Sequence, residues 1–165
     1  MFQQLTSEKQ KTLNIKRTLN LSIGTVWEAL SMPETFKKWW GPQGYTCPEC
    51  IIDFKISGKY LACMRAPNNK DYWSTGRFEE IVPMKRIVYS DSFADSTGKV
   101  IPASDVGMPG EWPMELKVTI ELDGNDSKTI LMLKHEGLPS EMLDDCMKSW
   151  NESFDKMEKN LKLEF

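Results

Sequence analysis

Residues 139–162 read PSEMLDDCMKSWNESFDKMEKNLK, and the spacing of their apolar side chains decides the fold class. Apolar residues recur at intervals of three and four, with charged residues between them. The apolar positions are Met142, Cys146, Trp150, Phe154, Met157 and Leu161, and Leu143 and Met147 lie beside this stripe. The pattern predicts a long amphipathic helix with one face on a hydrophobic core.

Upstream of this helix the hydrophobic period changes to two. Met114, Leu116, Val118, Ile120 and Leu122 alternate with charged and polar residues, which predicts a strand with one buried face. Further strands are expected at about 12–20, 46–55, 59–65, 72–82, 85–93 and 128–136. Two short helices, over 23–30 and about 33–39, are expected after the first strand.

Because the helices group together instead of alternating with the strands, the order of elements predicts an α+β fold. Short connections between the strands predict antiparallel pairing, so we expect a curved antiparallel sheet of about seven strands around the C-terminal helix. A cavity between helix and sheet would be the default ligand site. Residues 12–165 are expected to form a single domain, and residues 1–11 a tail or a short extra helix.

Composition excludes several classes of protein. Six Trp, seven Phe, four Tyr and ten Met are too many for a disordered chain. A net charge of −3 argues against nucleic acid as a partner. No apolar run is long enough for a membrane span, and the first residues lack a signal-peptide pattern. We therefore expect a cytoplasmic protein with reduced cysteines and no membrane partner.

Several motifs resemble one known family. Trp39-Trp40-Gly41-Pro42 followed by Tyr45-Thr46 resembles a signature of bacterial proteins similar to the C-terminal domain of the activator of the heat-shock protein 90 ATPase. Further similar segments are 76–83, 107–109 with 112–113, 129–139 and 150–156, and the resemblance covers about 13–163. These proteins belong to the START/birch-pollen-allergen (SRPBCC) superfamily, so the resemblance implies a helix-grip fold. It also implies a range of functions: carriers of hydrophobic ligands, polyketide cyclases and co-chaperones.

Cys47-Pro48-Glu49-Cys50 forms a C-x-x-C motif. A zinc ribbon needs four ligands, and the other cysteines are isolated in the sequence. Two residues three apart in a strand point to opposite faces, which argues against joint metal ligation unless a bulge or turn intervenes. We therefore expect structural cysteines, with no metal and no cofactor, while a redox or metal role stays open.

His135 is the only histidine and could act as a general acid or base, since its ordinary pKa lies near 6.5. The alternative interpretation is a hydrogen-bonded structural residue, and we favour it. Arg65 and Arg77 could anchor a carboxylate if either faces inward, although a solvated outer face is the simpler interpretation. Asp53 and Glu115 are similar cases.

Aromatic and methionine side chains are the most informative candidates for a ligand-binding wall. The candidates are Trp39, Trp40, Tyr60, Met64, Trp73, Phe93, Trp112, Met147, Trp150 and Phe154. We expect noncatalytic binding of a small hydrophobic molecule, with the long loop 94–112 and the Trp39–Trp40 corner as a lid.

Two alternatives remain open at this point. The first is a co-chaperone or interaction domain, which predicts a filled interior, an exposed patch and a chaperone partner. The second is a polyketide cyclase-like or hydrolase-like enzyme, in which His135 converges with an inward carboxylate or Tyr60. The sequence leaves the oligomeric state open, a homodimer included.

Overall fold

The computed structural model describes residues 10–162 and shows seven antiparallel strands and one long helix. The expected tail at 1–11 lies outside the described residues except for Gln10 and Lys11, which begin the first strand. The strands are β1 Gln10–Leu19, β2 Cys50–Ile52, β3 Lys59–Arg65, β4 Asp71–Val82, β5 Arg86–Ala94, β6 Leu116–Gly124 and β7 Thr129–Pro139. The α-helices are α2 Ile23–Ser31, α3 Pro33–Phe36 and α4 Leu143–Leu161, and the 3-10 helices are η1 Ala103–Val106 and η2 Ser140–Met142.

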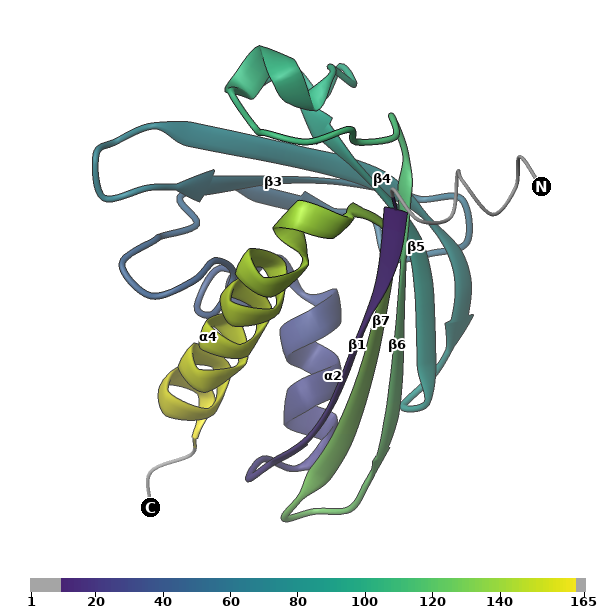
Figure 1. Ribbon diagram of the computed structural model, residues 1–165. Helices are drawn as coiled ribbons and strands as arrows, with labels where there is room; N and C mark the ends of the chain where they lie inside the picture. The colour runs from purple at the N-terminus through teal and green to yellow at the C-terminus, as the bar shows by residue number, and fades with distance from the viewer. Residues whose placement is uncertain (1–9, 163–165) are drawn as a thin grey trace, which may run out of the picture.

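The strands form one sheet in the order β1-β7-β6-β5-β4-β3-β2, and every neighbouring pair is antiparallel. Figure 1 shows the sheet curving around α4: β1, β7 and β6 run beside the helix, whereas β3 and β4 cross above it. The short helix α2 lies next to α4 on the same side of the sheet. The predicted α+β class, the antiparallel sheet and the two short helices after the first strand are confirmed.

The alternation predicted for β6 is confirmed, because Leu116, Val118, Ile120 and Leu122 are all buried in the core. Met114 was included in this pattern, but it precedes β6 and is 51% exposed. The prediction that Met114 belongs to the buried face of this strand is therefore wrong, because the long loop between β5 and β6 ends only at residue 115.

The amphipathic stripe of α4 is also confirmed, with Trp150, Phe154, Met157 and Leu161 buried against the sheet. Met147 does not belong to this buried face, since it is 38% exposed. Each residue of an α-helix is rotated by about 100° from the one before it, so Met147 is turned away from the stripe that Cys146 continues. None of the described helices is long and apolar enough to cross a lipid bilayer.

Three elements differ most from the sequence-based expectation. The strand expected at 46–55 is only Cys50–Ile52, because Thr46 makes an isolated bridge to Arg65 and Pro48 has no N–H to continue the ladder. The second short helix ends at Phe36 instead of residue 39. The long helix begins at Leu143 instead of 139, because β7 extends through Pro139 and η2 makes the turn between them.

Candidate functional site

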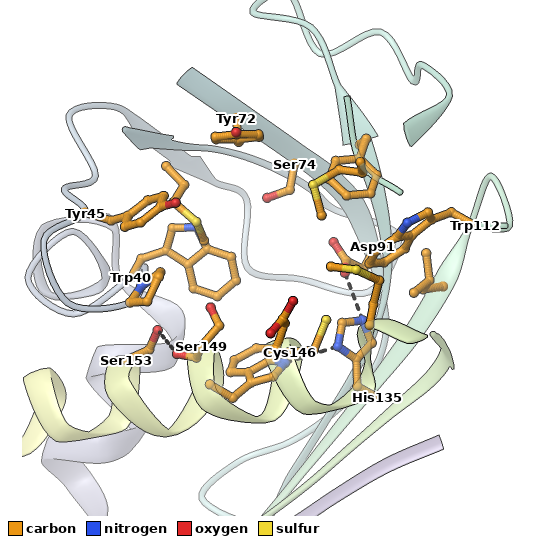
Figure 2. A pocket seen from close by; sticks show the side chains of 18 of the residues that line it. Trp40, Tyr45, Tyr72, Ser74, Asp91, Trp112, His135, Cys146, Ser149 and Ser153 are labelled. Atoms are coloured by element: carbon orange, nitrogen blue, oxygen red, sulfur yellow. Dashed lines mark hydrogen bonds and ion pairs between the residues drawn. The ribbon is translucent and has the colours of Figure 1, made fainter. Parts of the chain in front are cut away.

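A cavity of about 380 Å³ lies between the concave face of the sheet and the first half of α4 (Figure 2). Four parts of the chain form its walls: strands β3 to β7, helix α4 with η2, the corner after α3, and the loop between β5 and β6. The strands contribute Met64, Tyr72, Ser74, Asp91, Phe93 and His135, and α4 contributes Asp145, Cys146, Ser149, Trp150 and Ser153.

The corner after α3 supplies one wall through Trp40, Pro42 and Tyr45. Lys156 on α4 holds this corner in place, because its Nζ donates hydrogen bonds to the carbonyl oxygens of Gly41 and Tyr45, each at 2.9 Å. Partial burial lowers the pKa of Lys156. One turn earlier, Glu152 Oε1 accepts a hydrogen bond from the backbone N–H of Gln43 at 3.0 Å. Helix α4 therefore forms one wall of the cavity and also holds in place the corner after α3, which forms another wall.

The long loop between β5 and β6 reaches the cavity with Met108 and Trp112. The Trp112 ring packs edge-on against Phe93, with 5.2 Å between the centroids, and its Nε1 donates to the carbonyl oxygen of Pro109 at 2.8 Å. Lys70 fastens the loop at another point, because its Nζ donates to the carbonyl oxygen of Val106 at 2.9 Å. The segments expected to act as a lid thus border the cavity, and their movement stays a prediction.

A chain of hydrogen bonds crosses one side of the cavity and ends in the helix. Tyr60 Oη donates to Asp91 Oδ1 at 3.0 Å, and His135 Nε2 lies 3.1 Å from Asp91 Oδ2. Trp150 Nε1 donates to His135 Nδ1 at 3.1 Å. An indole N–H can only donate, so Nδ1 accepts and the ring proton of the neutral imidazole sits on Nε2, where it bonds to Asp91. This arrangement fixes a single tautomer of His135.

The convergence expected for an enzyme is present, because His135, Tyr60 and a carboxylate meet within hydrogen-bond distance. Both ring nitrogens of His135 are nevertheless already bonded, and the ring is buried, which matches the structural interpretation. Burial raises the pKa of Tyr60 well above its ordinary value, so its hydroxyl remains a donor to Asp91. Asp91 faces the cavity with unused acceptor positions, and its side chain is 22% exposed.

Six of the ten residues predicted to bind a ligand border the cavity. They are Trp40, Met64, Trp73, Phe93, Trp112 and Trp150. Trp73 alternates with Tyr72 and Ser74 along β4, so its side chain points to the opposite face of the sheet from theirs.

The other four predicted residues lie elsewhere. Trp39 is 1% exposed in the core, where its Nε1 donates to the carbonyl oxygen of Ala29 at 2.8 Å. Phe154 is fully buried and stacks on Trp39, and Tyr60 is a core residue that reaches the site only through its hydroxyl. Met147 is on the outer side of α4, for the reason given above. Large side chains at inward positions can fill a core as readily as line a cavity, and the sequence pattern does not separate the two.

The charged residues considered from sequence do not border the cavity. Arg65 pairs with Asp71 through Nε and Oδ1 at 2.7 Å on the surface, and Arg77 is exposed. Asp53 and Glu115 are exposed as well. The solvated outer position favoured for Arg65 and Arg77 is therefore confirmed, and Asp53 and Glu115 also lie outside the cavity, because each residue follows the solvent-facing parity of its strand or lies in a loop.

Cys47 and Cys50 are both buried in the core and their thiols contact each other, so the exception made for a bulge or turn between them applies. Opposite orientations would require an extended strand through both residues, but β2 begins only at Cys50. A hydrogen bond between the two thiols lowers the pKa of Cys47 and raises that of Cys50. Within residues 10–162, no group of three His, Cys, Asp or Glu side chains is arranged to hold a metal ion.

Sequence reasoning missed the polar part of the cavity, above all Asp91. Its position did contain a signal, because Asp91 shares its strand parity with Ile87, Tyr89 and Phe93, which face the interior. A carboxylate between two inward aromatic residues is unexpected unless it has partners or a ligand. The inward position of Ser149 and Cys146 could also have been predicted, since they occupy the same face of the helix as Trp150 and Ser153.

Comparisons with known proteins agree with this architecture. The structure is similar to that of a protein from Chromobacterium violaceum, with 25% identity, a TM-score of 0.73 and coverage of 93% of this chain and 98% of the other. The AHSA1 protein of Silicibacter pomeroyi has 19% identity and a TM-score of 0.73, with coverage of 92% and 97%. A protein from Nitrosomonas europaea has 21% identity and a TM-score of 0.71, with coverage of 91% and 93%.

No curated protein matches the chain. The family model described as "Activator of Hsp90 ATPase homolog 1-like protein" matches residues 20–162, which include every element from α2 to α4. That match confirms the family that the motifs around Trp39-Trp40-Gly41-Pro42 and in α4 predicted. By its sequence motifs, its strand order and this match, the chain belongs to the Activator of Hsp90 ATPase homolog 1-like family.

Proposed function

We propose that this protein binds a compact, largely apolar small molecule in the cavity between the sheet and α4, and does not transform it chemically. The observation that carries the proposal is the cavity itself, because its volume of about 380 Å³ falls in the range of small-molecule sites. Its walls combine aromatic side chains with a few polar groups, which is the usual composition of such sites. Noncatalytic binding is favoured because the two ring nitrogens of His135 already bond to Asp91 and Trp150.

The experiment is a titration followed by tryptophan fluorescence, since Trp40, Trp112 and Trp150 border the cavity. A panel of uncharged phenyl and naphthyl compounds is added to the wild type and to Ser149→Phe, which places a ring inside the cavity from α4. Lys148→Phe is the matched control, because it makes an equally bulky change at the neighbouring position, where the side chain is 77% exposed.

At least one panel compound is expected to shift the fluorescence of the wild type and of Lys148→Phe with similar dissociation constants. Ser149→Phe is expected to weaken that binding at least tenfold while circular dichroism shows it folded. A wild type that responds to no compound would contradict the proposal, and so would a Ser149→Phe variant that binds as well as the wild type.

The name of the family supplies a second candidate, an interaction with the chaperone Hsp90. That function would depend on an outer surface, where large apolar side chains such as Ile51 and Ile56 are exposed. A pull-down with purified Hsp90 separates the two functions, because filling the cavity with Ser149→Phe leaves that surface unchanged. Stimulation of the chaperone's ATPase by wild type and variant alike would favour the second candidate.

A further inference from the structure

The charges around the cavity are all of one sign. Among the described residues that border it, two carry carboxylates, Asp91 and Asp145, and none is lysine or arginine. Two ammonium groups near the walls bind elsewhere. Lys156 bonds to the carbonyl oxygens of the corner, and Lys70 bonds to Val106 and lies 4.9 Å from the centroid of the Tyr72 ring. A bound carboxylate would therefore meet two acidic side chains, and both ammonium groups near the walls are already engaged with other partners.

Of the two carboxylates that border the cavity, Asp145 is exposed to solvent, whereas the Asp91 side chain is only 22% exposed and depends on the cavity for its remaining hydrogen bonds. A carboxylate offers about four acceptor positions, and Tyr60 and His135 occupy only two of them. Neither partner is a cation in this arrangement, since Tyr60 keeps its proton and Trp150 donates to His135 Nδ1. The negative charge of Asp91 is thus hydrogen-bonded but not neutralised. A ligand that displaces water from Asp91 without donating to it would leave that charge poorly solvated.

The aromatic side chains that border the cavity also favour a cationic ligand. The faces of indole and phenol rings attract a cation within about 6 Å, and tryptophan does so most strongly. Trp40, Trp112 and Trp150 border the cavity together with Tyr45 (Figure 2). Tyr72 borders it too, but the Lys70 ammonium already lies over its ring. An ammonium group bound to Asp91 would have a carboxylate to receive its N–H donors inside a cavity with aromatic walls, while its apolar body filled the remaining space.

We propose that the cavity selects a compact apolar molecule with a primary amine, which binds as the ammonium ion to Asp91. This inference rests on the proposed binding function and names the chemical class of its ligand. It excludes fatty acids and other apolar carboxylates as preferred ligands, because the site offers them no positive partner.

The test uses three probes with the same phenylbutyl body and different head groups: 4-phenylbutylamine, 4-phenylbutanol and 4-phenylbutyrate. Isothermal titration calorimetry at neutral pH and low salt measures each affinity for the wild type. We expect the amine to bind at least tenfold more tightly than the alcohol, and the carboxylate to bind most weakly. Equal affinities, or a preference for the carboxylate, would overturn the amine proposal.

Asp91→Asn tests the residue directly. It is expected to weaken binding of 4-phenylbutylamine at least tenfold and to change binding of the alcohol less than threefold. Asp144→Asn is the matched control, because Asp144 is an exposed carboxylate in the first turn of α4 that does not border the cavity. It should leave the affinities of all three probes within twofold of the wild type. Loss of amine binding in both variants alike would assign the effect to general electrostatics and overturn the role of Asp91.

A second test is needed because Asp91→Asn also changes the folded protein: an amide NH2 replaces one of the two carboxylate oxygens that accept from Tyr60 and His135. A crystal structure of the wild type with 4-phenylbutylamine provides the independent test. The amine nitrogen is expected within hydrogen-bond distance of Asp91, and a nitrogen at the cavity mouth would contradict the proposal. If the alcohol and the carboxylate bind as well as the amine and Ser149→Phe abolishes all three, the cavity function stands and only the amine preference fails.

Discussion

The space between the sheet and α4 is filled at one end and open at the other. At the filled end, around Trp39 and Phe78, the residual void is only about 20 Å³, whereas the open end has a cavity of about 380 Å³. The same elements build both ends. Strand β4 has Phe78 at the filled end and Ser74 at the open end. Helix α4 has Phe154 at the filled end and Ser149 at the open end. The cavity thus arises where short polar residues replace large apolar ones on the same faces.

This difference predicts that the two ends tolerate truncation very differently. Phe154→Ala removes a fully buried ring that stacks on Trp39 and Trp150, and should destabilise the protein by about 3–5 kcal/mol. Phe93→Ala makes the same change at the cavity wall, where the ring already borders open space, and should cost only about 1–2 kcal/mol. Urea unfolding at 25 °C measures both free energies. Similar losses for the two variants would mean that the open end is packed as tightly as the filled end.

The adjacent residues Trp39 and Trp40 allow a finer comparison, because they lie on either side of the boundary. Trp39→Phe removes the hydrogen bond from Nε1 to the carbonyl oxygen of Ala29 and should cost about 2 kcal/mol. The Nε1 of Trp40 is buried and finds no hydrogen-bond partner among the described residues, so Trp40→Phe should change stability by less than about 1 kcal/mol.

Trp40 borders both the cavity and the small void of the filled end. The same unfolding experiment on Trp39→Phe and Trp40→Phe should therefore be combined with the ligand titration. Trp40→Phe is expected to alter ligand affinity with little change in stability, and Trp39→Phe to do the reverse. A larger stability loss for Trp40→Phe than for Trp39→Phe would contradict this division of the two regions.

The filled end was largely predictable from sequence, for a simple physical reason. Burial of apolar side chains imposes a period of two on β6 and a three-four spacing on α4, and both patterns are visible in the order of residues. These patterns predicted the antiparallel sheet and the helix across it. They placed Trp150 and Phe154 correctly on the buried face of α4, and they erred at Met147 because a residue at the edge of the stripe can turn outward.

The open end was less predictable, because a cavity has no periodic pattern of its own. Ser74 and Ser149 look like solvent-facing residues in the sequence, since short polar side chains are common on surfaces. Only the curvature of the sheet and the register of β4 with β5 show that they face the interior. The inward orientation of Asp91 could be predicted from strand parity alone. Its partners Tyr60 and His135 are 31 and 44 residues away in the chain, so these contacts could be identified only from the three-dimensional structure.

Tyr60 connects the two ends, because its ring borders the small void and its hydroxyl bonds to Asp91 in the cavity. Desolvation raises its pKa in the folded protein well above the ordinary value, and the pKa of Tyr89, which packs edge-on against it at 5.4 Å, is raised as well. Tyrosines in the unfolded chain ionise near pH 10, so the unfolded state loses these protons first. Stability should therefore be constant with respect to these groups below about pH 9 and should fall as the pH rises above 10.

Each such tyrosine contributes at most about 1.4 kcal/mol per pH unit to this decrease. Urea unfolding at pH 9, 10 and 11 should show a shallower decrease for Tyr60→Phe than for the wild type, and a still shallower one for the double variant Tyr60→Phe/Tyr89→Phe. The comparison uses slopes, because Tyr60→Phe also removes the bond to Asp91 and lowers stability at every pH. If Tyr60→Phe decreases as steeply as the wild type, the hydroxyl is open to solvent, and the boundary between the filled and open ends does not lie at Tyr60.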